Sequence, residues 1–451
     1  MRALMFTLFL FAFSCLQLTA QESLHKDEVD RISFEQFQKK QFKELKTTLK
    51  QALENKIDFY YLRLRAGILA YDNKNYEYAI PQFRQTLEFF PSDTLSKEYL
   101  YYAYLFSDRK ETAHDFASKQ TESFQRKVGY KKKPFDFVGI DGGAMITSNI
   151  TSNRGKIFKT DAVLGKSERT LNGNLFFGDF FFQNTVKNRL HINNSFSFFY
   201  TQALYEIEVL LPFNRFKAKS EFNNLNFQYN FGLSYTTQKE WTIAAGFGFY
   251  RIKGNTFTAV EPDTINNRIP IISDTTAINS FLGSVTVSKR CKHVQPYIQL
   301  SGSNLNNVTQ LQAEAGLTYY PLGNYTFYGK TSGTYLRNGS QNQYVIGQKI
   351  GFKVLNWWWN ELNFNYGNTM INYISNNGFL TYNTSDPIKL LAGINFNFYI
   401  KKHFQLGLEY NFQHRERTTQ FYIKELAGLV VNSQPSNYFN HSIKTSLLWN
   451  F

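Results

Sequence analysis

Cysteine and long apolar runs are both scarce in this sequence. Its 451 residues include two cysteines, Cys15 in the N-terminal segment and Cys291. A single cysteine beyond that segment excludes an intrachain disulfide in the mature chain. No stretch of about 18 or more apolar residues follows the N-terminus, so any membrane crossing is not helical. There is neither a His/Cys cluster with metal-ligand spacing nor a glycine-rich phosphate loop. We therefore expect no cofactor and no metal.

Aromatic side chains, in contrast, are abundant. They make up 18% of the chain, with 45 Phe and 29 Tyr, although the mean hydropathy is −0.39. Such a mixture suits strands whose two faces meet different solvents. The formal net charge of +15 comes from Lys and Arg residues that are scattered through expected turns, without a recognition motif for nucleic acid. We expect no nucleic-acid partner and favour attraction to an anionic lipid surface.

The N-terminus has the features of a secretory signal. Arg2 precedes an apolar run from Ala3 to Leu16, and small residues lead to a cleavage point at Ala20. We assign residues 1–20 to this signal. A membrane anchor is the alternative, but the run is short. Lipidation at Cys15 is disfavoured because Phe13 stands where a small residue is expected.

Residues 21–127 have helical spacing and almost no glycine, with a period of 34 residues. The clearest unit, residues 60–93, resembles a tetratricopeptide repeat, although Arg63 and Lys74 replace the family's usual Trp and Gly. Small residues suit the helix crossing, aromatic residues fill the groove, and a proline ends the second helix. The residues that match the family's spacing are Gly67, Tyr76, Ala79, Phe83 and Pro91.

Weaker copies of the unit flank it at residues 26–59 and 94–127, which gives the three units that a stable solenoid needs. The resemblance implies a scaffold that binds a periplasmic or inner-membrane protein through residues 24–127. A generic helical spacer is the alternative. The lysine-rich segment 128–134 then forms a basic linker that ends at Pro134.

From residue 135 onward, apolar and polar residues alternate. The segments 225–235, 388–400 and 403–415 each carry apolar residues at one parity and polar residues at the other. A soluble sandwich also alternates. The strands here are long, however, and short turns (237–240, 289–292, 321–324, 401–402) face several longer connections. Those connections are expected at 150–168, 204–218, 254–276, 373–385 and 418–436.

Long strands with this alternation of turn lengths are typical of outer-membrane barrels. We predict a short helical solenoid followed by an antiparallel transmembrane β-barrel over residues 135–451. It has about fourteen strands, with twelve or sixteen as alternatives. An even number puts both barrel ends on one side, next to a periplasmic helical domain. The expected strand centres are 141, 177, 196, 228, 247, 284, 298, 315, 331, 347, 364, 394, 410 and 444.

The last segment, "TSLLWNF", resembles the terminal strand signal of Gram-negative outer-membrane barrels. In that family the barrel assembly machinery binds a final strand that ends in an aromatic residue. The resemblance implies this role for Leu447, Trp449 and Phe451. It also implies two partners, the assembly machinery and outer-membrane lipid.

The lumen is the expected functional region of the barrel. Parity predicts that six charged side chains face inward, where mixed charge tunes solute selectivity. The alternative is a plugged barrel in which these charges only pair with one another. The six residues are Glu314, Lys349, Lys353, Lys389, Glu409 and Arg415.

Catalysis is the least favoured function. His191 shares a strand face with Ser195 and Ser197, but the sequence indicates no third orienting group for a hydrolase. We therefore expect no catalytic residues, and His and Ser are ordinary residues for a wet lumen.

The combination of helical repeats and barrel is similar in architecture to exopolysaccharide-export porins. It implies a passive channel or export port in the outer membrane whose periplasmic repeats recruit a partner. A non-transporting accessory or anchor subunit of an outer-membrane machine is the alternative.

Overall fold

The computed structural model describes residues 25–154, 165–376, 379–382, 386–401, 403–425 and 428–451, without the side chains of 369 and 419–432. The expected signal at 1–20 lies outside these residues. The chain divides into two compact units, Met1–Ser107 and Asp108–Phe451. In the described part of the chain, no helix is both long and apolar enough to cross a bilayer.

Helices account for the first unit and the start of the second. Helices that begin at 26, 60 and 94 alternate with helices that begin at 42, 76 and 110, so equivalent helices start 34 residues apart. The bounds are α2 (Lys26–Gln38), α3 (Phe42–Glu54), α4 (Tyr60–Asp72), α5 (Tyr76–Phe89), α6 (Thr94–Phe106), α7 (Lys110–Ser118) and α8 (Glu122–Lys127).

The contact between α4 and α5 explains the expected small residues. A Cβ atom on Gly67 would lie 2.6 Å from the Phe83 ring, so only glycine lets this ring pack against α4. Phe83 and Ala79 are both 0% exposed, Tyr76 is buried, and Pro91 follows the end of α5. These five residues therefore lie at or beside one helix–helix contact. Whether the unit is a tetratricopeptide repeat stays a prediction.

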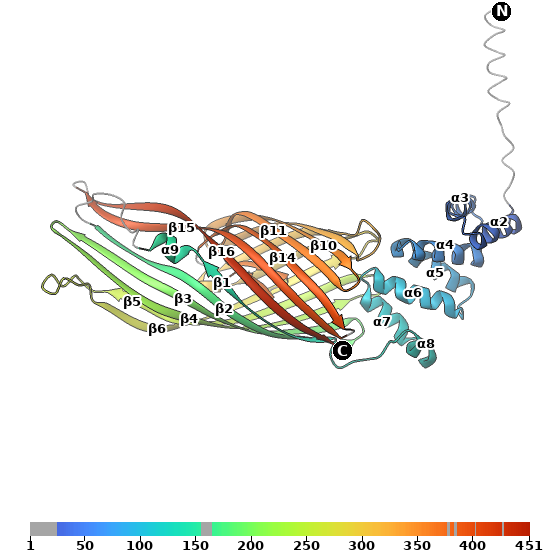
Figure 1. The fold of residues 1–451 in the computed structure, drawn as a ribbon, viewed down its shortest axis with the longest axis horizontal. Coiled ribbons are helices and arrows are strands. Elements are labelled where there is room, and N and C mark those ends of the chain that lie inside the picture. Colours follow the sequence, from blue (N-terminus) through green and yellow to red (C-terminus); the bar gives the residue numbers. More distant parts are fainter. Residues whose placement is uncertain (1–24, 155–164, 377–378, 383–385, 402, 426–427) are drawn as a thin grey trace, which may run out of the picture. The chain divides into compact units, whose positions relative to one another are not determined.

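The second unit contains a closed antiparallel barrel of fourteen strands in the described residues (Figure 1). All fourteen expected strand centres lie within these strands. The strands are β1 (Phe137–Thr147), β2 (Gly165–Lys187), β3 (Leu190–Leu211), β4 (Asn214–Thr236), β5 (Trp241–Ala259), β6 (Ile271–Lys289), β7 (Val294–Ser303), β8 (Gln310–Tyr319), β9 (Phe327–Asn338), β10 (Gln341–Leu355), β11 (Trp358–Met370), β14 (Ile388–Lys401), β15 (Phe404–Glu425) and β16 (Gly428–Asn450).

The barrel closes where its first strand meets its last. β1 pairs with β16 in antiparallel register from Phe137–Asn450 to Thr147–Asn440. Closure leaves no unpaired edge along this seam. Short connections join β2 to β3, β4 to β5 and β14 to β15 at the end where β1 begins and β16 finishes. We call this the short-turn end.

Apolar side chains cover the outside of the wall. On β7, Ile298 and Leu300 are exposed while their neighbours Gln299 and Ser301 are buried, as period-two alternation requires. The pattern recurs around the barrel, at Ile140, Phe180, Phe196, Phe227, Phe247, Phe281, Ile346, Leu362, Phe364, Leu408 and Ile443.

Two expected loops are strands instead. The segment 204–218 continues β3 and β4 as a paired extension, and 418–436 continues β15 and β16. In the first case the six residues from Ala203 to Glu208 are all buried, because both faces of the extension are covered. The alternation persists here, since Tyr205, Ile207 and Val209 alternate with Glu206 and Glu208. The two glutamates make the segment resemble a polar connection, whereas in the structure Glu206 is buried 2.9 Å from Arg169.

Candidate functional site in the barrel lumen

The connection between β11 and β14 folds into the barrel. It contains a small hairpin of β12 (Tyr373–Ser375) and β13 (Leu380–Tyr382). Ile374 is fully buried with Tyr250, Leu282 and Leu305, which belong to the wall at β5 and β6 and to a turn that follows β7. The hairpin is therefore an internal element of the lumen. The sequence predicted only a long loop at 373–385.

Hydrogen bonds fix the hairpin to the inner wall. The Gln312 side chain on β8 accepts from the Ile374 backbone N–H at 3.1 Å and donates to the Ile374 carbonyl at 2.6 Å. Gln310 donates to the Asn372 carbonyl at 2.7 Å. An amide side chain that satisfies both backbone groups of one residue replaces the pairing that a neighbouring strand would supply.

The hairpin crosses the full width of the barrel. The Thr381 hydroxyl lies 2.9 Å from the Tyr250 hydroxyl on β5. The Phe379 ring packs over Gly232 on β4, where a Cβ atom would lie 2.7 Å from it. Since β4 is seven positions from β11 in either direction around the barrel, the hairpin touches the wall opposite its own strands.

A cavity of about 1070 Å³ lies between this hairpin and the short-turn end. Amide, hydroxyl and charged side chains supply most of its lining residues, and residues such as Phe137 and Leu448 place it near the terminal seam. One side is aromatic: Phe137 lies 6.2 Å from Phe181, and Phe177 lies 6.1 Å from Phe199, between ring centroids. The lumen thus combines a largely polar lining with an aromatic wall on β1, β2 and β3.

Charged side chains in the cavity pair with one another along the wall. Lys444 lies 2.9 Å from Glu409 and 3.5 Å from Asp141, each between ammonium nitrogen and carboxylate oxygen. Lys349 lies 3.4 Å from Glu361. The charged lining is five carboxylates against four cations, namely Asp141, Asp179, Glu314, Glu361 and Glu409 with Lys330, Lys349, Lys444 and Arg415.

Four of the six expected lumen residues therefore line this cavity. Besides Lys349 and Glu409, Glu314 accepts hydrogen bonds from Tyr297 at 2.5 Å and from Thr334 at 3.2 Å. Arg415 donates to the Gln413 side chain at 2.7 Å. These contacts run along the wall of the barrel, so they do not fill the cavity.

Lys353 and Lys389 are not among the residues that line the cavity. Lys353 is exposed near the turn from β10 to β11. On β14 a register shift between Ile388 and Leu390 interrupts the alternation. Lys389 there donates to the Asn368 carbonyl at 2.6 Å and lies 3.7 Å from Glu416. Parity does not carry through a bulge, so the alternation of the neighbouring residues does not fix the face of Lys389.

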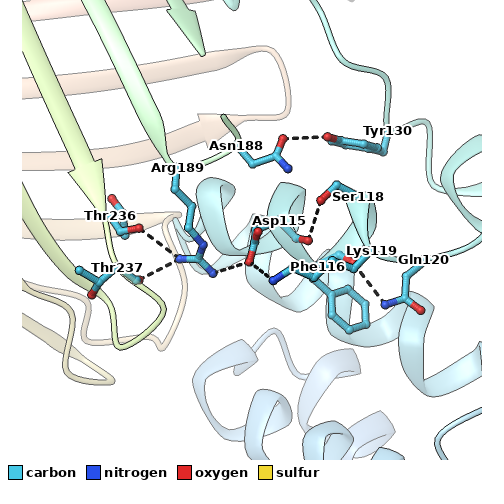
Figure 2. A network of polar contacts seen from close by, with 10 residues as sticks. All are labelled: Asp115, Phe116, Ser118, Lys119, Gln120, Tyr130, Asn188, Arg189, Thr236 and Thr237. Atoms are coloured by element: carbon cyan, nitrogen blue, oxygen red, sulfur yellow. Dashed lines mark hydrogen bonds and ion pairs between the residues drawn. The ribbon is translucent and has the colours of Figure 1, made fainter. Parts of the chain in front are cut away.

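A second polar network joins α7 to the short turns of the barrel. Arg189, in the turn from β2 to β3, lies 2.9 Å from Asp115 on α7 and donates to the Thr237 carbonyl at 2.8 Å (Figure 2). Arg109 lies 2.8 Å from Glu240 in the turn from β4 to β5. Buried charges in pairs of this kind fix α7 to the barrel.

These contacts set the charge states of the titratable side chains around α7. Burial would raise the pKa of Asp136, but contacts with His191 and Thr185 outweigh it and hold that pKa below its usual range. The same balance of burial against His191 lowers the pKa of Glu111. Burial lowers the pKa of His114 to about 4, and the Lys110 charge acts in the same direction. At neutral pH both carboxylates are charged and His114 is neutral.

His191 belongs to this network. Its Nε2 atom lies 3.2 Å from Glu111, and its Nδ1 atom lies 2.7 Å from the Thr185 hydroxyl. Ser195 is four residues further along β3, about 13 Å away at the rise of a strand. That separation does not fit the hydrogen-bonded Ser–His pair of a hydrolase.

The expected assembly-signal residues lie on the outer face of the seam. Leu447 and Trp449 on β16 are exposed, as is Phe451. The Phe451 backbone N–H donates to the Asp136 carbonyl at 3.2 Å, which continues the pairing with β1 beyond Asn450. The machinery that these residues engage stays a prediction.

Comparison with known proteins gives likeness in architecture alone. No protein-family model matches the chain, and no curated protein matches its sequence. A FadL homologue of Pseudomonas aeruginosa is 9% identical, with 77% of this chain and 94% of that chain covered and a TM-score of 0.44. The P. putida toluene transporter TodX is 8% identical, with the same coverage and a TM-score of 0.42. The translocator domain of the Neisseria meningitidis autotransporter NalP is 7% identical, with 77% and 100% covered and a TM-score of 0.30.

The sequence indicates neither the hairpin nor the α7 network. Gln312 reads as one more polar residue on an inward face, and nothing local marks it as the partner of Ile374. Asp115 and Arg189 are 74 positions apart, so only the fold brings them together. The short apolar runs around Ile374 and Leu380, set in a polar connection, were the one available signal.

Proposed function

We propose that the chain is an outer-membrane β-barrel that serves as a passive channel or export port, with its lumen narrowed by the β12–β13 hairpin. The observation that carries the proposal is a closed barrel, apolar outside and polar inside, that holds a cavity of about 1070 Å³. A barrel that served only as an anchor would not need an internal cavity of this size. No catalytic step is part of the proposal.

The positions of the exposed aromatic residues support the proposal that the barrel is inserted in a membrane. Trp241, Trp357 and Trp449 are exposed near the short-turn end, where an interfacial aromatic belt would lie. In bacterial outer-membrane barrels the short turns face the periplasm. By that rule the short-turn end and the helical unit that precedes it belong to the periplasm.

The lining favours a polar solute of small net charge. Five carboxylates and four cations nearly balance, and ion pairs such as Lys444 with Glu409 weaken the field that each charge produces. Amide and hydroxyl groups would replace hydration of the solute, and the aromatic wall offers flat surfaces to its apolar faces. We expect cation and anion permeabilities that differ by less than about threefold.

Single-channel recording in planar bilayers tests this function. The full chain should conduct, and releasing the hairpin with Gln312→Ala and Phe379→Ala should raise the conductance or make it fluctuate. Asn342→Ala, outside the hairpin contacts, is the matched control and should leave the conductance unchanged. If neither the native chain nor the double variant conducts while both are inserted, the accessory or anchor function replaces the channel.

For the helical unit we propose the recruitment of a periplasmic or inner-membrane protein. Phe34 and Tyr61 are exposed, and both rings lie within 6 Å of the Arg65 guanidinium, at 5.4 and 5.6 Å. Clustered exposed aromatic side chains beside an arginine are typical of binding surfaces. A photo-crosslinker at Tyr61 should yield one discrete adduct in cells. Lys50, exposed on α3, is the control position, and equal labelling from both positions would contradict the proposal.

A further inference from the structure

We propose that a basic pocket at the short-turn end binds the phosphate group of an anionic phospholipid. The pocket has a volume of about 140 Å³. Its walls come from α7, from the linker after α8, from the end of β2 and from Phe451. The proposal rests on the membrane insertion proposed above. It adds a ligand and a binding site that a channel would not need in order to conduct.

Four lysines line the pocket, against one acidic side chain. They are Lys110 on α7 and the consecutive Lys131, Lys132 and Lys133 of the linker. Within the described residues, no ion pair involves Lys110, Lys131 or Lys132. The one carboxylate, Asp136, accepts hydrogen bonds from Thr185 at 2.6 Å and from Gln183 at 3.1 Å. These hydrogen bonds anchor Asp136 to β2, while the Lys110 charge also lowers its pKa.

The linker is held in shape around the pocket. Tyr130 donates to the Asn188 side chain at 2.8 Å, and its ring lies 5.5 Å from that of His114. Gly129 has φ of +68°, a conformation in which a side chain would be strained, and it turns the chain from α8 into the linker. The three lysines thus start from a fixed backbone, which reduces the entropy lost when they bind an anion.

An aromatic cluster borders the same pocket and favours a lipid over a free anion. The Phe135 ring lies 5.7 Å from Phe182 and 6.0 Å from Phe451. Phe451 is exposed, and Phe182 is on β2 beside the exposed Phe180 in outward parity. A phospholipid offers a phosphate to the lysines and an acyl chain to these rings, whereas free phosphate has no use for the second surface. Lysine ammonium groups act as flexible point charges that suit a phosphodiester.

Native mass spectrometry of the full chain, released from nanodiscs that contain equal amounts of phosphatidylglycerol and phosphatidylethanolamine, tests the site. The native protein should retain phosphatidylglycerol with a preference of about fivefold. A variant with Lys131→Gln, Lys132→Gln and Lys133→Gln should lose that preference. The matched control, Lys239→Gln with Lys292→Gln and Lys401→Gln, removes three exposed lysines from other short turns and should retain it.

Two further arms make each outcome decisive. Replacing the same three linker lysines by arginine keeps their charge and should restore the preference. Millimolar inorganic phosphate should not displace the lipid, and displacement would identify a free-anion site and overturn the lipid assignment. Equal losses in the linker variant and the control would mean nonspecific attraction and would also overturn it. Heat-modifiable gel mobility checks barrel insertion separately. A loss of lipid binding can therefore be distinguished from a failure of the barrel to insert.

Discussion

The helical unit and the barrel place apolar and polar side chains in opposite positions. The helices bury apolar side chains, whereas the barrel exposes them and buries polar ones. In the helices, Phe83 and Leu62 are fully buried. In the barrel, Ile346 is 65% exposed while Gln312 and Glu314 are buried. One chain therefore has an apolar core at its beginning and a polar interior over the rest of its length.

The difference teaches that each region is built for its own surroundings. The helices bury apolar surface because water surrounds them. The strands expose it because lipid is the expected neighbour of their outer face, while every backbone group is paired within the closed wall. Composition averaged over the whole chain hides both patterns, since the mean hydropathy is −0.39.

The strongest test of the contrast is a cavity in the helical core. Phe83→Ala removes the ring that packs against Gly67 and should lower the free energy of unfolding of the helical unit by about 3–5 kcal/mol. Circular dichroism at the helix band, followed against urea on the full chain in detergent, measures it. Phe89→Ala, at an exposed position, should cost less than about 1 kcal/mol. Equal costs would contradict a core centred on Phe83.

A charge placed on neighbouring residues of β11 separates the two faces of the wall. Phe364 is exposed on the outside, whereas Asn365 lines the cavity. Phe364→Arg should destabilise the inserted barrel by about 2–4 kcal/mol near the membrane midplane. Asn365→Arg should change it far less, because this residue faces the cavity and not the outside of the wall. Folding into lipid vesicles, followed by tryptophan fluorescence against urea, compares them. A larger loss for Asn365→Arg would invert the assigned faces.

Acidification should loosen α7 through His114. Burial lowers its pKa to about 4 from the ordinary value of 6.5. Between these values the unfolded segment binds the proton and the folded one does not, so stability is complete above pH 6.5 and falls as the pH drops toward 4. The loss should not exceed about 3 kcal/mol. Hydrogen exchange of α7, corrected for intrinsic rates, measures it, and His114→Gln should remove this dependence.

The smallest effects concern the pairs that Asp115 makes. Arg189→Met breaks a mostly buried contact and should reduce α7 protection by about 1–3 kcal/mol. Lys119 pairs with the same carboxylate at 2.8 Å but is 58% exposed. Lys119→Met should therefore cost less than about 0.5 kcal/mol. Equal effects in hydrogen exchange would show that burial does not set the strength of these pairs.

Sequence was sufficient for the repetitive parts of the fold. Each strand carries its own evidence, because alternation such as that around Leu225 and Phe227 depends on one strand and its two faces. The helix starts follow from local spacing in the same way. The strand number and the antiparallel order could both be predicted.

Features that depend on distant partners could not. The buried run from Ala203 to Glu208 resembles a polar connection because it carries two glutamates, and Arg169, the partner of Glu206, lies 37 positions away. Lys389 lies within a register shift between Ile388 and Leu390, which has no local signature. The inward hairpin depends on Gln312 and Gly232, which lie far from it in sequence and resemble ordinary lumen residues. The cavity walls could be predicted, whereas the element that crosses them could not.

Barrel closure has a consequence for biogenesis. Phe137 pairs with Asn450, more than three hundred positions later, so the seam forms only after nearly the entire polypeptide has been synthesised and delivered. Contacts this distant slow folding. Until they form, two strand edges and a hydrophobic exterior are open to aggregation. The supply of a chaperone that shields both surfaces before insertion should therefore limit the yield of inserted barrel. A chain truncated before β16 should be degraded rather than inserted.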